Sequence, residues 1–385
     1  MSADERPFHP ISTLPTELLA EIFVQYVPAY PICPLLIGDG SPAKLLLVSR
    51  SWRDLALSTL SLWTRIKLFD GPGTPEIHLK VAKLWLERSR SLPLSISIAG
   101  EWRRYDEGFE SRVRALSFLL RHRARWEYAY LHLTDIPYSI RNRVDLHPEP
   151  FGGSFPRLRE LDIQFETGQW KGRYPLLHID APLLRHAFYR VEFIVPTHNL
   201  DTILPLAQLT RLTLRHLDVF TATSLLRYTK NLVHCRLDLR DEDDELATGA
   251  DPTGIDLPHL KTLVLGAHPY HRPTRAPLLR FLTSLAARAP PLQNLAIELL
   301  LLTGVIGPFN VLEAFATLRR ACSFVSPLAR VSIMGSWSSA YPREDACLAQ
   351  FPVRFPEIGC LEIGTSTRPY NPPVQGWGNW DLLEL

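Results

Sequence analysis

The chain has 385 residues, of which 65 are leucine and 33 are proline, and its formal net charge at pH 7 is +2. With 46% hydrophobic and 21% charged residues, the composition excludes a disordered chain, and the near-neutral charge argues against a dedicated nucleic-acid binder. The length predicts two or three domains or one long repeat array. Because proline breaks long helices, we expect the leucines in short, punctuated units.

The cysteines and the apolar stretches of the sequence bear on the compartment of the protein. The five cysteines lie far apart without a Cys-x-x-Cys pair, so the sequence indicates neither a zinc ribbon nor a thioredoxin-like redox pair. The N-terminus lacks the apolar core of a secretion signal, and the longest charge-free apolar stretch, 299–309, is too short to span a bilayer. We therefore expect a cytoplasmic and/or nuclear protein with no membrane contact.

The first seventy residues predict three small helices. The stretch 12–27 has apolar residues at steps of three and four, Pro15 suits a first helical turn, and Glu17 lies near the positive end of the helix dipole. A second helix is expected to start at Ser41-Pro42, and a third unit covers 60–63. The apolar positions are Leu14, Leu18, Leu19, Ile22, Phe23 and Tyr26, then Leu45, Val48, Trp52 and Leu55. The pattern alone leaves open a plain helical cap and a partner-binding face.

The segments LPTELLAEIF and KLLLVSRSWRDLALSTLSLWTRI closely resemble the F-box of fungal, basidiomycete-style F-box proteins with irregular leucine-rich repeats. The resemblance covers 11–67, with a longer and more proline-rich spacer between the two blocks and Leu60 where the family often has proline. It implies docking on a Skp-type adaptor and, through it, on a cullin–RING ubiquitin ligase. The implied adaptor-binding residues are Leu14, Pro15, Glu17, Leu18, Ile22, Phe23, Val48 and Trp52.

A motif Leu-x-x-Leu-x-Leu/Ile, often introduced by proline, recurs behind this head. Clear copies start at Leu158, Leu209, Leu232 and Leu260, and further copies at Leu292, Leu328 and Ile358 extend the series. A weaker copy starts at Leu183, degenerate ones lie before residue 134, and the steps range from 23 to 36 residues. Each copy alternates as a short strand, and helix-like stretches separate the copies. The expected fold is an α/β solenoid: a small all-α F-box head and a divergent leucine-rich-repeat arc with a parallel sheet.

Residues between the strand leucines are expected to line the concave side of the arc. The candidate substrate-binding residues are Asp162, Gln164, Thr213, Arg215, Arg236 and Asp238. Their mixed charge indicates no ligand of a single sign. The alternative for each residue is an ordinary solvated strand face.

Candidate chemistry elsewhere is weak. The segment 38–44 lacks the serine or threonine of a phosphate loop, His268 and His271 have no third metal ligand, and the carboxylates of 241–245 lack the spacing of a calcium loop. The arginines of 112–125 are interleaved with leucines, which favours an amphipathic helix over a nucleic-acid site. We expect no catalytic residues, no metal and no cofactor, and therefore not an enzyme.

The expected domains are an F-box over 1–70, a repeat domain over 71–368, and a tail over 369–385 whose Trp377 and Trp380 either cap the array or anchor a substrate. The resulting hypothesis is a substrate-recognition subunit of an SCF-type ubiquitin ligase. The alternatives are a non-degradative F-box scaffold and, less favoured, an enzyme in a repeat fold. The substrate would be a protein that the sequence does not identify.

Overall fold

The structure is a computed structural model in which two compact units form. Unit 1 comprises Met1–Pro150 with Phe155–Leu158, and unit 2 comprises Phe151–Ser154 with Arg159–Leu385. The residues described are 10–69, 73–99, 109–134, 153–166, 179–191, 204–240, 255–267, 275–286, 291–298, 301, 315–316, 319, 328–335, 353–356, 358 and 360–365. The domain limits expected at 70 and 368 stay predictions. The tail, the histidines at 268 and 271 and the acidic run at 241–245 lie outside these residues.

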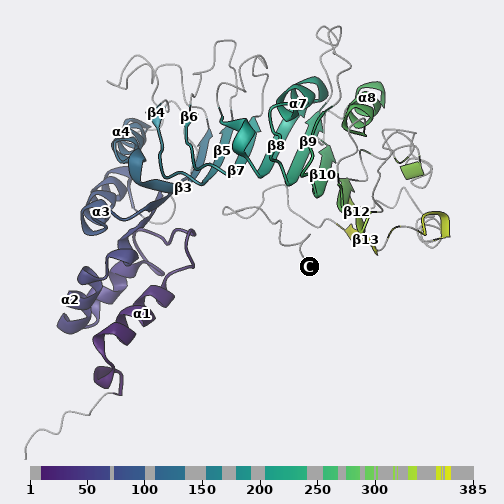
Figure 1. Cartoon of the computed structure of the whole chain (residues 1–385). Helices are drawn as coiled ribbons and strands as arrows, with labels where there is room; N and C mark the ends of the chain where they lie inside the picture. Colours follow the sequence, from purple (N-terminus) through teal and green to yellow (C-terminus); the bar gives the residue numbers. More distant parts are fainter. Residues whose placement is uncertain are drawn as a thin grey trace, which may run out of the picture. The chain divides into compact units, whose positions relative to one another are not determined.

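Unit 1 begins with short helices. They are η1 (Pro10–Thr13), α1 (Thr16–Tyr26), η2 (Pro42–Leu47), α2 (Arg50–Ser58) and η3 (Leu60–Trp63) (Figure 1). The prediction of a first helix with Pro15 at its start is confirmed, since Pro15 is the N-cap residue of α1. The prediction of one continuous second helix is wrong. The hydroxyl of Ser49 accepts a hydrogen bond from the Trp52 backbone N–H at 3.1 Å, so a new helix starts there.

Aromatic side chains hold these helices together. The rings of Phe23 and Trp52 lie 4.8 Å apart, and those of Trp63 and Trp85 lie 5.4 Å apart edge to face. Trp63 is fully buried, and its indole N–H donates to the Ala56 carbonyl at 3.0 Å. Aromatic pairs of this kind add stability beyond the area they bury.

The rest of unit 1 combines strands and helices. Its elements are β1 (Arg65–Leu68), α3 (Pro75–Arg88), β2 (Leu94–Ile98), α4 (Phe109–Leu120), η4 (Arg123–Arg125) and β3 (Trp126–Thr134). β1 pairs with β2 and β2 with β3, both in parallel. The strand β1 was not expected from the sequence. Leu116, Leu119 and Leu120 are buried, which supports an amphipathic helix in the arginine-rich stretch.

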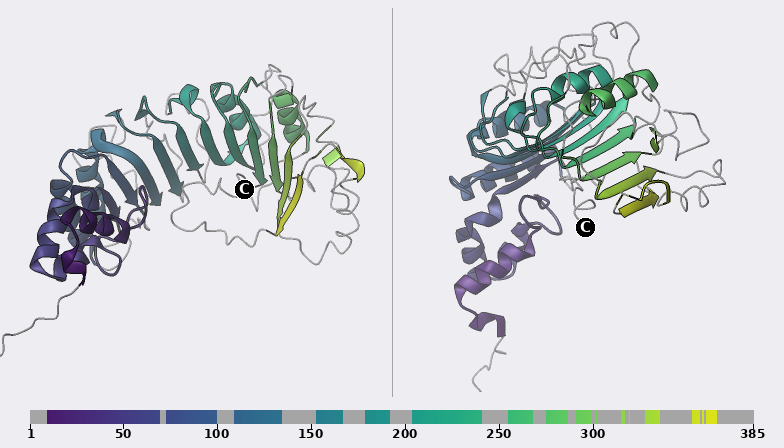
Figure 2. Two further views of the ribbon diagram at one scale, coloured as in Figure 1. Left: turned by 60° about the horizontal axis from the view of Figure 1, so that its bottom comes forward. Right: turned by 45° about the vertical axis from the view of Figure 1, so that its right-hand side comes forward.

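Unit 2 is built on a parallel sheet, and Figure 2 shows its strands side by side with α7 and α8 over one face. The strands, in spatial order, are β5 (Glu160–Glu166), β7 (His186–Val191), β8 (Arg211–Asp218), β9 (His234–Arg240), β10 (Thr262–Ala267), β11 (Asn294–Glu298), β12 (Arg330–Gly335) and β13 (Cys360–Thr365). The helices are α7 (Val219–Leu226) and α8 (Arg275–Ala286), with η6 at Leu206–Gln208. A separate small sheet pairs β4 (Gly153–Ser154) with β6 (Ile179–Asp180).

A proline turn precedes several of these strands. The backbone N–H of Leu158 donates to the Phe155 carbonyl at 3.1 Å, Leu184 donates to Ala181 at 3.0 Å, and Leu260 donates to Leu257 at 3.2 Å. In each turn the second residue is proline, which pre-sets the backbone angle that this position needs. Pro156, Pro182 and Pro258 are therefore turn residues.

The sheet of unit 2 has two different faces. Along β5 the residues Leu161 and Ile163 are buried on one face, and Asp162 and Gln164 lie on the other. The in-register pairing continues this division across the strands, so one face is apolar and the other, which we call the polar face, is mostly polar. The α/β character and the parallel sheet expected from the sequence are confirmed.

Candidate protein-binding surfaces

The helix α1 carries two apolar stripes. The inner stripe consists of Leu19, Phe23 and Val27, and all three side chains are buried, Phe23 with 1% exposed. Residues four apart lie on one face of a helix, so these three side chains point toward the same core. The inner stripe thus belongs to the interior of unit 1.

The outer stripe consists of Leu18, Ile22 and Tyr26, which are 55%, 45% and 45% exposed. Because successive helical residues point about 100° apart, this stripe faces away from the core that holds the inner one. Leu47 and Val48, next to α2, add two further exposed side chains. These five residues form what we call the exposed apolar set. Grouped apolar side chains at a surface mark interaction sites more often than scattered ones do.

The eight residues expected to bind an adaptor divide between surface and core. Pro15, Glu17, Leu18, Ile22 and Val48 are exposed, whereas Leu14 and Trp52 are half-buried. Phe23 is buried against Trp52, so it is not on the surface of the chain. The sequence prediction omitted Tyr26 and Leu47. The spacing of four residues from Ile22 was the signal that could have added Tyr26.

Charged side chains border the exposed apolar set. Glu17 and Glu21 are exposed, each one position before a member of the outer stripe, and Gln25 donates to Glu21 at 3.1 Å. Lys44 pairs with Asp39 at 3.0 Å, and this carboxylate raises the pKa of the lysine. An apolar centre with a polar rim is the usual make-up of a protein–protein interface.

The second candidate surface is the polar face of unit 2. Asp162, Thr213 and Arg236 lie in one row across β5, β8 and β9, and Phe188 of β7 lies between the first two. The structure therefore brings these predicted residues onto one face.

The other three predicted residues lie in the next row of the same face. Gln164 is on β5, and Arg215 on β8 is in register with Asp238 on β9. All six predicted substrate-binding residues thus share the polar face.

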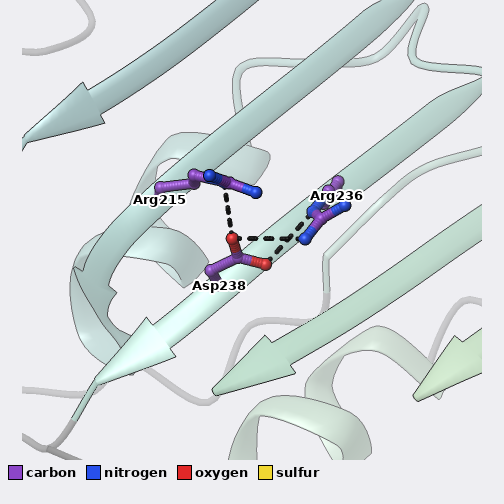
Figure 3. Close-up of polar contacts among 3 residues, drawn as sticks. All are labelled: Arg215, Arg236 and Asp238. Atoms are coloured by element: carbon purple, nitrogen blue, oxygen red, sulfur yellow. Dashed lines mark hydrogen bonds and ion pairs between the residues drawn. The ribbon is translucent and has the colours of Figure 1, made fainter. Parts of the chain in front are cut away.

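An ion-pair cluster lies at the centre of this face (Figure 3). The Nε atom of Arg215 is 2.7 Å from Oδ2 of Asp238, without the alignment of a hydrogen bond. Arg236 donates from Nε to Oδ1 of the same carboxylate at 3.2 Å. The Arg215 guanidinium also lies 5.5 Å from the centre of the Phe188 ring. One carboxylate is therefore held by two arginines from adjacent strands.

Gly266 leaves room for the side chain of Asp238. It is in register with Asp238, and a Cβ atom on it would overlap Oδ1 of that carboxylate and lie 3.3 Å from Oε2 of Glu298. No other residue type leaves this room, because every other side chain begins with a Cβ. The glycine thus allows the carboxylate to lean over the neighbouring strand.

Most side chains of the polar face are shielded from water. Asp162, Gln164, Thr213 and Asp238 are buried, and Arg236, with 27% of its side chain exposed, is the more open of the two arginines. Burial raises the pKa of Asp162 well above its ordinary value, and Arg215 offsets this only partly. Oδ1 of Asp162 has no hydrogen-bond partner. These side chains therefore do not form an ordinary solvated strand face.

Two other kinds of site, a metal site and a membrane-spanning helix, are not formed within the described part of the chain. There, no group of three or more His, Cys, Asp or Glu side chains is placed to hold a metal ion. No helix among the described residues has the length and apolarity needed to cross a membrane. No family model matches the chain, and no curated protein or solved structure is significantly similar to it.

Proposed function

We propose that this chain is the substrate-recognition subunit of an SCF-type cullin–RING ubiquitin ligase, with α1, η2 and α2 acting as an F-box that docks a Skp-type adaptor. The observation that carries the proposal is the outer stripe of α1. It presents Leu18 and Ile22 to solvent at positions that match the F-box pattern of the sequence. An apolar stripe that the core does not use needs a partner to cover it.

The repeated turn, strand and helix support the second part of the proposal, a divergent leucine-rich-repeat solenoid that holds a protein substrate on the polar face, where the side chains of Arg215 and Arg236 stay 16% and 27% exposed. Each strand pairs in parallel with the next one, and a proline turn sets the start of several strands. Such arrays bury their leucines between neighbouring units and offer a long binding surface. The ligase subunit itself would work by tethering, which raises the effective concentration of substrate.

The test compares two matched double variants of the full chain by calorimetric titration with purified adaptor. Leu18→Ala with Ile22→Ala removes the outer stripe, whereas Leu84→Ala with Ile77→Ala removes side chains of similar exposure, 47% and 43%, from α3. We expect the first variant to bind at least ~30-fold more weakly, because one central apolar anchor contributes about 2 kcal/mol or more and the contributions of two neighbouring anchors are not additive. The α3 variant should bind as wild type does.

If the two variants bind the adaptor equally well, the outer stripe is not the docking surface. If the wild-type chain does not bind the adaptor, the proposal that it docks a Skp-type adaptor is wrong. Ubiquitin transfer separates the remaining alternative. A chain that binds adaptor and cullin but supports no transfer in a reconstituted ligase, and whose loss leaves the half-lives of its partners unchanged, is a scaffold.

A further inference from the structure

The spacer between α1 and η2 (residues 28–41) is rich in proline and glycine, a composition typical of an exposed loop. In the structure its central residues are buried. Cys33 and Leu36 are 4% and 1% exposed, and Ser41 is also buried. Burial on this scale requires that the spacer pack on another part of unit 1.

The spacer packs on the polar side of β1, β2 and β3. In these strands Arg65 is in register with Ser95, and Ser95 with Tyr128, so the three residues form one row. The Sγ atom of Cys33 lies 3.3 Å from Oγ and 3.4 Å from the carbonyl oxygen of Ser95. Arg65 donates to the Pro28 carbonyl and Ser95 to that of Pro31.

The edge of this contact is aromatic. The ring of Tyr30 meets that of Tyr128 edge to face at 5.0 Å, and its hydroxyl donates to Oε2 of Glu127 at 2.9 Å. Burial, with Glu127 beside it, raises the pKa of Tyr30, so the hydroxyl keeps its proton and stays a donor. Every strand of this part of the sheet is therefore contacted by the spacer.

These contacts close the polar side of the three strands. Arg65, Lys67, Ser95 and Ser97 are all buried, although their residue types favour water. Burial also raises the pKa of the Cys33 thiol to about 11, so that it is a neutral group in the contact. The polar side of β1, β2 and β3 is thus covered by the chain itself.

The other end of the spacer is fixed to the helices. Ser41 donates from its hydroxyl to the Leu36 carbonyl at 2.9 Å, and the same oxygen accepts from the Ala43 N–H at 3.2 Å, at the start of η2. At the near end, Val27 of the inner stripe is buried in the helical core. The spacer is therefore anchored to α1, to η2 and to the strands.

We infer that the spacer is a brace: it fixes α1 and η2, with the exposed apolar set, on β1–β3, and it closes the polar side of these strands to partners. Its purpose rests on the proposed function, because a ligase subunit that tethers its substrate gains from a fixed distance to the adaptor. The brace itself is a property of the chain alone. The two ideas can therefore fail separately.

Hydrogen exchange of the full chain, read by mass spectrometry over 28–36 and 126–130, tests the brace. Tyr30→Ala removes the ring and the hydroxyl, Tyr30→Phe removes only the bond to Glu127, and Tyr228→Ala removes a similarly exposed tyrosine from unit 2. We expect the rate of hydrogen exchange in both segments to rise at least tenfold in Tyr30→Ala. The rate should rise less in Tyr30→Phe and should not change in Tyr228→Ala. If Tyr30→Ala fails to fold, Tyr30→Phe alone decides the outcome.

Unprotected exchange of 28–36 in wild type, or equal exchange in the Tyr30 variants, would overturn the brace. If the adaptor binds, Tyr30→Ala should bind it within about twofold of wild type, since the outer stripe is intact. In a reconstituted ligase, however, ubiquitin should be transferred to a wider set of lysines of the Tyr30→Ala chain than of the wild-type chain. An unchanged set of lysines would also overturn the brace, whereas absence of adaptor binding by wild type would leave the exchange result standing.

Discussion

The outer stripe of α1 and the polar face of unit 2 were both expected to be binding surfaces, and they differ in exposure. On the helix, Leu18 and Ile22 are apolar and open to water. On the sheet, Asp162 and Thr213 are polar and buried. A helix can carry more apolar positions than one core takes up, so an excess stripe remains outside. Strands lie about 4.8 Å apart, so large side chains on one face bury each other whatever their polarity. Pattern alone therefore indicates a face, and not its accessibility.

The largest effect should separate the two stripes of α1. Phe23→Ala removes a ring from the core against Trp52 and should lower the free energy of unfolding by about 3–5 kcal/mol. Leu18→Ala, on the exposed side, should change it by no more than about 0.5 kcal/mol. Urea denaturation followed by tryptophan fluorescence measures both. Similar losses in the two variants would mean that the stripes do not differ.

The ion-pair cluster should give the next largest effect. Asp238→Asn leaves Arg215 and Arg236 without their shared counter-charge in a largely buried site. We expect it to lower the free energy of unfolding by about 3 kcal/mol. Asp180→Asn is the matched control, since Asp180 is exposed in the same unit. Thermal unfolding of the two variants measures the difference. A Tm for Asp238→Asn equal to that of the control would show that the polar face is solvated after all.

Gly266→Ala should lower the free energy of unfolding by about 1–3 kcal/mol, because the new Cβ displaces the Asp238 carboxylate from its position over β10. In an Asp238→Ala background the same substitution should cost clearly less. A double-mutant cycle by urea denaturation measures this coupling. Additive losses would separate the glycine from the ion-pair cluster.

The smallest effect concerns pH. Burial raises the pKa of Asp162, so between the ordinary aspartate pKa, about 4, and its raised value the folded chain binds the extra proton. Stability then falls as pH rises through this window, by up to about 1.4 kcal/mol per pH unit. Asp162→Asn should flatten the dependence of Tm on pH, and Asp256→Asn, which changes an exposed carboxylate, should not. A parallel profile for Asp162→Asn and wild type would show an ordinary, solvated carboxyl group.

The sequence predicted what depends on local pattern. The stripe of α1, the strands of the leucine motifs and the helices α3, α4, α7 and α8 follow from spacing alone, and the weak motif near Leu183 also led to a strand, β7. The placing of the six polar residues on one face followed as well, because alternation and parallel register place residues by rule.

The sequence pattern did not predict contacts between residues that lie far apart in the chain. Nothing in the spacer indicates that Cys33 meets Ser95, sixty-two residues later, and nothing in the segment around Ile66 distinguishes β1 from a helical end. Phe23 has the same apolar character as Ile22, and only the packing of Trp52 decides which one is buried. The break at Ser49 is a local signal, a hydroxyl cap, that the continuous apolar spacing obscured.

The main-chain bonds at the start of the strands of unit 2 have a consequence for how such a chain can change. The N–H of Arg185 donates to the Arg159 carbonyl, Thr210 to Arg185, Val233 to Thr210 and Lys261 to Val233, at 2.8 to 2.9 Å. Each strand is thus aligned at the residue just before its start, independently of the number of residues that separate it from the strand before. Insertions and deletions between one strand's end and the next turn leave this alignment untouched. Units of unequal length can therefore build one regular sheet, and one unit can be lengthened without rebuilding its neighbours.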